Sequence, residues 1–111
     1  MMRPPLSRAA THLLRQLLER AGLPRDKVLI REFRSTDWHS LTYEGERHEI
    51  SLRIPQPDAK VAANRLTHGL ADAEFVLPGH VVADIALTSE PATEPDGSIA
   101  IEIEALTLAD A

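Results

Sequence analysis

The stretch that decides the fold is residues 29–54, LIREFRSTDWHSLTYEGERHEISLRI, which predicts a ribbon of two antiparallel β-strands. In its second half, polar residues alternate with side chains that share one face, namely His48, Ile50, Leu52 and Ile54. A period of two is typical of a strand with one buried face, so another element must cover this face. The turn is predicted at residues 44–47, which would place Leu41 and Tyr43 of the first strand beside Ile50 and His48 of the second.

Residues 36–39 interrupt the alternation of the first strand and predict a β-bulge. This segment contains Trp38, the only tryptophan of the chain, followed by His39. The simplest interpretation is that Trp38 closes the core or a subunit contact, because tryptophan often anchors interfaces. A pocket lined by both side chains is the alternative.

The rest of the chain predicts two helices and a second pair of strands. Residues 7–21 carry leucine and alanine at helical spacing, with Ser7 as a capping residue and Gly22 as the stop. Residues 58–73 show a weaker helical pattern. Alternation with a period of two returns at residues 80–88 and 98–108, on either side of a proline-containing loop.

The order helix, strand, strand, helix, strand, strand predicts an α+β domain. We expect a two-layer sandwich with a four-stranded, mainly antiparallel sheet and both helices on one face. A ferredoxin-like fold, circularly permuted so that its first strand comes last, would give the same order of elements. The strands would then run third, fourth, second, first, with the second and fourth parallel at the centre. We expect residues 1–6 to be a flexible N-terminus, 7–108 the domain and 109–111 a C-terminal tail.

Composition excludes several classes of function. The 111 residues carry a formal net charge of -5, which argues against a nucleic-acid partner because such binding needs clustered Lys and Arg. The chain contains no cysteine, which excludes disulfides and thiolate metal sites and fits a reducing compartment. No run of residues resembles a signal peptide or a membrane span, so we expect a cytoplasmic protein without a membrane partner.

The sheet face opposite the helices is the candidate ligand or interface face. Its predicted polar residues are Arg53, His80, Asp84, Glu102 and Glu104. One natural register sets Asp84 opposite Glu102, and such like charges need a cation, Arg53 or a raised carboxyl pKa. These groups could bind a divalent cation or supply a general acid and base. A solvated outer face balanced by Arg53 is the simpler interpretation.

Fingerprints of metal, cofactor or nucleophile sites are missing from the sequence. The five histidines lack the spacing of metal ligands, and His48 is interpreted as a hydrogen-bonded residue at the edge of the core. There is no glycine-rich phosphate loop and no Gly-x-Ser-x-Gly motif. We therefore predict no metal and no cofactor.

Two hypotheses for function remain. The first is a binding or assembly module that forms a homo-oligomer through the open sheet face or an edge strand. Arg47 and Arg53 of one chain could meet acidic residues of the other, which predicts salt-sensitive dimerisation. The second hypothesis is a small enzyme or a domain that binds a small molecule or a divalent cation on the same face.

Overall fold

The computed structural model describes residues 6–110, and its first helix, α1 (Arg8–Ala21), forms where the leucine spacing predicts it. The side chain of Ser7 caps this helix by accepting a hydrogen bond from the backbone N–H of Ala10 at 3.1 Å. Gly22 ends it with a φ of 75°, a left-handed conformation that glycine adopts without a Cβ clash. The prediction of a helix over residues 7–21 is confirmed.

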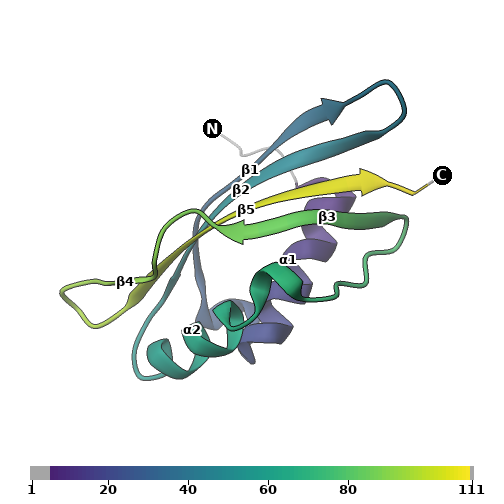
Figure 1. The fold of residues 1–111 in the computed structure, drawn as a ribbon. Helices are drawn as coiled ribbons and strands as arrows, with labels where there is room; N and C mark the ends of the chain where they lie inside the picture. Colours follow the sequence, from purple (N-terminus) through teal and green to yellow (C-terminus); the bar gives the residue numbers. More distant parts are fainter. Residues whose placement is uncertain (1–5, 111) are drawn as a thin grey trace.

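Two helices cover one face of an antiparallel sheet (Figure 1). The second helix and the strands are α2 (Ala59–Thr67), β1 (Leu29–His39), β2 (Glu44–Ile54), β3 (His80–Leu87), β4 (Ala92–Thr93) and β5 (Ile99–Ala109). Two single-turn 3-10 helices, η1 (Arg25–Lys27) and η2 (Leu70–Asp72), lie in the connections. Gly69, with a φ of 65°, separates α2 from η2, so the second helix ends before the predicted residue 73.

The four long strands lie in the order β1-β2-β5-β3, which is the predicted order. The expectation that the two central strands are parallel was wrong, because β2 and β5 pair antiparallel. β3 also pairs antiparallel with β5, so it runs in the same direction as β2, to which α2 connects it. A strand that turns back along β3 must therefore oppose β2 as well. The short β4 also pairs with β5 and gives a fifth strand, where four were expected.

The β1–β2 turn lies at residues 40–43 and not at the predicted residues 44–47. The backbone N–H of Ser40 donates to the carbonyl of Tyr43 at 2.8 Å and closes this loop. Gly45 lies inside β2 and not in the turn. A Cβ at this position would come within 2.0 Å of the Thr107 carbonyl oxygen on β5, so the glycine permits close approach of the two strands. As a result of the earlier turn, the residues beside Ile50 and His48 are Phe33 and Ser35, and not Leu41 and Tyr43.

Two β-bulges shift the faces of the edge strands. β1 pairs regularly over residues 36–39, where a bulge was predicted, and is irregular between Ile30 and Glu32 instead. β3 is irregular between Val82 and Asp84, a position that the sequence does not mark. This bulge reverses the predicted faces of the first residues of β3: Val82 packs against the core, and Val81 is 49 % exposed.

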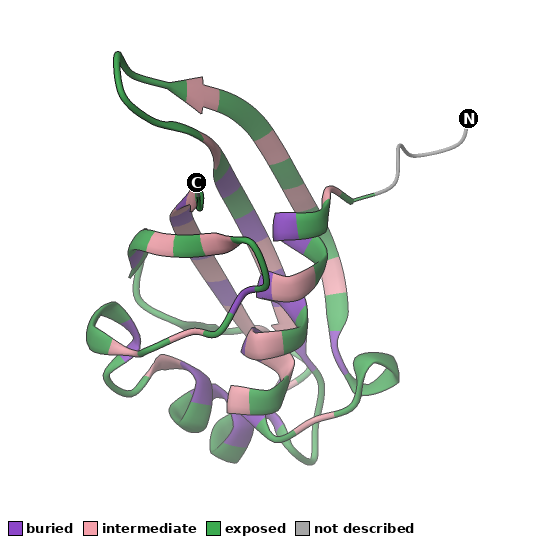
Figure 2. Ribbon diagram, turned by 90° about the vertical axis from the view of Figure 1, so that its right-hand side faces the viewer, coloured by how far each residue is buried: buried purple, intermediate pink, exposed green. Residues whose placement is uncertain are grey.

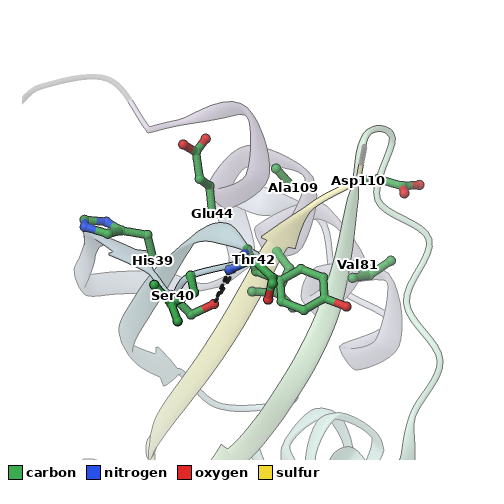
Figure 3. A pocket seen from close by; sticks show the side chains of 10 residues that line it. His39, Ser40, Thr42, Glu44, Val81, Ala109 and Asp110 are labelled. Carbon is green, nitrogen blue, oxygen red and sulfur yellow. Dashed lines mark hydrogen bonds between the residues drawn. The ribbon is translucent and has the colours of Figure 1, made fainter.

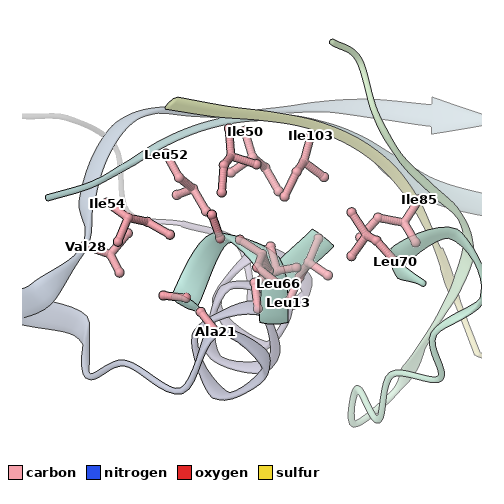
Figure 4. Close-up of a cluster of buried hydrophobic side chains, with 14 of the residues drawn as sticks. Leu13, Ala21, Val28, Ile50, Leu52, Ile54, Leu66, Leu70, Ile85 and Ile103 are labelled. Carbon is pink, nitrogen blue, oxygen red and sulfur yellow. The ribbon is translucent and has the colours of Figure 1, made fainter. Parts of the chain in front are cut away.

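The core lies between the helices and the inward face of the sheet (Figure 4). Its largest fully buried apolar side chains are Leu13, Leu17, Leu52, Ile54, Leu66, Ile101 and Ile103. The inward alternation predicted for β2 is thus confirmed. Burial decreases toward the outer end of the β1–β2 hairpin, which Figure 2 shows as exposed.

Leu6 and Asp110 are the first and last described residues. Of the predicted flexible segment, residues 1–6, only Leu6 therefore lies within the described part of the chain. β5 continues to Ala109, one residue beyond the predicted end of the domain, and the backbone N–H of Asp110 donates to the Gly79 carbonyl at 2.9 Å. Within residues 6–110, none of the helices has the length and apolar character that crossing a bilayer requires.

Candidate functional site

The sheet face away from the helices, called the open face below, is the surface on which the sequence places candidate residues (Figure 1). The registers and the alternation of side chains put the following residues on it: Glu32, Arg34, Thr36, Trp38, Gly45, Arg47, Glu49, Ser51, Arg53, Val81, Asp84, Ala86, Ala100, Glu102, Glu104, Leu106 and Leu108. It divides into a charged centre and an apolar end.

In the charged centre, two carboxylates lie directly opposite each other on β2 and β5. Glu49 pairs with Glu104, an arrangement that is unfavourable unless cations are near. Arg34 forms an ion pair with Glu49, and Arg47 forms one with Glu104 at 2.7 Å. Because each of these two carboxylates has its own guanidinium within the chain, this opposed pair is balanced without a second molecule.

The predicted pair of Asp84 and Glu102 is not formed. Asp84 lies opposite Leu106, whereas Glu102 lies opposite Ser51, whose hydroxyl donates to its carboxylate at 2.9 Å. The register of β3 against β5 lies four residues from the predicted one, since Asp84 pairs with residue 106 and not with residue 102. The bulge between Val82 and Asp84 turns His80 toward the side of the helices. Among residues 6–110, no three His, Asp or Glu side chains are arranged so that they could hold a metal ion.

Arg53 lies at the opposite end of the open face from the hairpin loop and binds the turn that precedes β5. Its Nε donates to Ser98 Oγ at 2.7 Å, and its Nη2 donates to Asp96 Oδ2 at 2.5 Å. The backbone N–H of Ser98 also donates to Asp96 at 3.0 Å. The hydrogen bonds from Ser98, together with the Arg53 guanidinium, hold the pKa of Asp96 below its ordinary value. Arg53 therefore fixes a turn and does not face Asp84.

The apolar end of the open face, called the hairpin-end patch, consists of Leu41, Tyr43, Val81 and Leu108. These residues surround a hollow of about 580 Å³ between the hairpin loop and the ends of β3 and β5, with His39, Glu44 and Asp110 also lining it (Figure 3). Leu41 is fully exposed at 105 %, Tyr43 at 56 % and Val81 at 49 %. Exposed apolar side chains that gather in one place mark interaction surfaces more often than scattered ones do.

Sequence reasoning missed this patch for two reasons. It placed Leu41 and Tyr43 in a strand with inward side chains, because Gly45 was read as part of the turn. It placed Val81 inward, because the bulge in β3 leaves no signal in the sequence. Of the two residues predicted at a pocket or interface, His39 lines the hollow, and Trp38 lies half-buried on the adjoining part of the open face, opposite Gly45.

His48 is fully buried at 0 % exposure, where the sequence predicted a hydrogen-bonded histidine at the edge of the core. Its Nδ1 lies 2.7 Å from Ser35 Oγ on β1, and its Nε2 lies 2.8 Å from Thr107 Oγ1 on β5. The ring of Phe33 meets the imidazole edge-on, at a centroid distance of 5.9 Å. Both ring nitrogens are satisfied by side chains of neighbouring strands, which is the arrangement of a structural histidine.

Comparison with protein-family models, with curated proteins and with solved structures gave no match for this chain.

Proposed function

We propose that the protein is a binding and assembly module in which two copies associate through the hairpin-end patch. The observation that carries this proposal is the gathering of exposed apolar side chains. Seven large apolar residues are exposed within residues 6–110, and three of them, Leu41, Tyr43 and Val81, surround the same hollow of about 580 Å³. Burial of such residues against a partner removes apolar area from water and stabilises the complex.

The other surfaces of the sheet support association less well. Two contacting charged centres would have to desolvate ion pairs such as Arg47–Glu104, which are already satisfied within one chain. The free edge of β1 carries a bulge between Ile30 and Glu32 together with charged side chains, and both features oppose pairing with another strand. The hairpin-end patch has neither obstacle.

A second copy of the chain fits this patch because the patch contains both a protruding and a recessed part. A twofold contact brings the same surface of each chain together, so it needs a patch that is complementary to itself. Leu41 projects from the loop, and the hollow lies beside it. Tyr43 supplies a large amphipathic side chain of the kind enriched where binding energy concentrates.

We also propose a cytoplasmic location for the protein. The lack of cysteine in the sequence fits a reducing compartment and supports this location. The net charge of -5 favours a protein partner over nucleic acid.

The test is multi-angle light scattering over a concentration series at fixed ionic strength. We expect wild type to approach twice the chain mass of 12.2 kDa, and Leu41→Ser to weaken the dimer at least about tenfold, the equivalent of about 1.4 kcal/mol. The matched control is Val76→Ser, because Val76 is 77 % exposed but lies outside the patch. A wild-type chain that stays monomeric at millimolar concentration, or a Leu41→Ser dimer as tight as wild type, contradicts the proposal.

A further inference from the structure

A second hollow, called the α1 groove, lies between the C-terminal half of α1 and the chain that leaves it. Its volume is about 500 Å³, and its apolar walls come from Leu14, Leu18, Leu23 and Pro24. Leu14 is 7 % exposed, while Leu18 and Leu23 are half-buried and pack against the core. This volume lies within the range of about 300–1,000 Å³ that is usual for small-molecule sites.

The end of α1 explains why an apolar hollow forms at this place. The backbone N–H groups of Gly22 and Leu23 both donate to the Leu18 carbonyl, at 3.0 and 3.2 Å. The bond from Leu23 is that of a Schellman turn, in which the residue after the left-handed glycine folds back onto the last helical turn. Leu23 therefore lies alongside Leu18 and lines the groove with it.

The charges around the α1 groove are positive, in contrast to the acidic chain as a whole. Arg15 and Arg25 line it, and within residues 6–110 neither of them forms an ion pair. Arg65 of α2 reaches the same end of the helix, since its Nη1 would lie 2.8 Å from a Cβ on Gly22. Residues 8–27 contain five basic and two acidic side chains, although the net charge of the chain is -5.

We propose that the α1 groove binds a free single-chain amphiphile with a carboxylate head. The hydrocarbon chain lies against Leu14, Leu18 and Leu23, and the head group lies between Arg15 and Arg25. Guanidinium groups bind carboxylates through charge-assisted, often bidentate hydrogen bonds, so an anionic head is matched and a cationic head is repelled. Glu19 also lines the groove and opposes the anion, which makes it a residue whose neutralisation strengthens binding.

A free amphiphile fits better than a membrane surface. Helices that lie in a bilayer interface usually insert aromatic side chains, and α1 (RAATHLLRQLLERA) contains none. The chain also carries a net charge of -5, which repels anionic lipid headgroups outside the local patch.

The probe is decanoate below its critical micelle concentration, titrated into the isotopically labelled full chain and followed by NMR. We expect shifts at Leu18 and Leu23, and binding of decyltrimethylammonium, which has the same chain and a cationic head, at least tenfold weaker. The double variant with Arg15→Gln and Arg25→Gln should lose at least tenfold in decanoate affinity, and Glu19→Gln should gain severalfold. Arg8→Gln, on the same helix but outside the groove, is the control and should bind as wild type does.

Equal binding of the two head groups, unchanged affinity in the double variant, or shifts confined to the hairpin-end patch would overturn this assignment. Binding to phosphatidylglycerol vesicles that depends on Arg15 and Arg25 would also overturn it, in favour of a membrane surface. The inference is independent of the proposed dimer. Leu41→Ser should leave decanoate binding unchanged, so the two proposals can fail separately.

Discussion

His48 is the residue whose surroundings are most completely determined. The Thr107 hydroxyl donates to the Glu46 carbonyl over 3.5 Å, and with its single proton used there, it must accept from His48 Nε2. Nδ1 of the neutral ring then accepts from the Ser35 hydroxyl. In this tautomer a chain of hydrogen bonds runs across β1, β2 and β5 with His48 uncharged. Burial lowers the pKa of His48 below its ordinary value of 6.5, His80 acts in the same direction, and Glu46 opposes them.

This lowered pKa predicts a loss of stability in mild acid. The unfolded chain takes up the proton near pH 6.5, whereas the folded chain takes it up only at lower pH. The contribution of neutral His48 is therefore complete above pH 6.5 and is lost as pH falls below it, with a slope of at most about 1.4 kcal/mol per pH unit. Urea denaturation between pH 7.5 and 5.5 measures this slope. His48→Gln should flatten it, and His68→Gln, at an exposed histidine, should not; equal slopes in both variants would contradict the assignment.

At the scale of elements, the β1–β2 hairpin shows how far local pattern reaches. The alternation through Ile50, Leu52 and Ile54 predicts the buried face of β2, because burial of one face alone sets it. The predicted position of the turn was wrong, because a glycine can either form a turn or permit close approach of two strands. Which role Gly45 has depends on Thr107, which is distant in sequence. The bulge between Val82 and Asp84 was not predicted, because it too depends on pairing with a strand that is distant in sequence. These two errors concealed the hairpin-end patch.

Gly45 therefore gives a prediction about strand pairing. Gly45→Ala should cost about 3 kcal/mol, since the new Cβ would meet backbone on β5 that cannot move aside without separating the strands. Gly79→Ala is the comparison: its φ is 78° and a Cβ would meet nothing within 4 Å, so it should cost only about 1 kcal/mol of left-handed strain. Chemical denaturation of both variants measures the difference. Equal losses would mean that close approach of the backbones is not why residue 45 is glycine.

At the scale of the whole molecule, sequence reasoning was weakest where distant elements meet. The layers and the strand order follow from the order of elements, but the antiparallel central pair depends on how α2 returns the chain. The candidate residues Asp84, Glu102 and Arg53 share a face, yet each has a different neighbour, because β3 pairs with β5 in another register than expected and Arg53 binds the turn at Ser98. The exposed ion pairs of this face are expected to contribute about 0–1 kcal/mol each to stability. Their main effect is to balance the opposed carboxylates Glu49 and Glu104 within one chain.

That pairing of the arginines within each chain reverses the salt dependence first expected for a dimer. With Arg47 paired to Glu104 inside each chain, little attraction remains between two charged centres, and two chains of net charge -5 repel each other. Salt screens this repulsion over a Debye length of about 10 Å at 0.1 M, while apolar contacts at the hairpin-end patch are not weakened. We therefore expect the dimer dissociation constant to fall as sodium chloride rises from 20 to about 300 mM. Light scattering over this series measures it. A dimer that weakens instead would locate the contact at the charged centre, with Arg47 and Arg53 meeting carboxylates of the other chain.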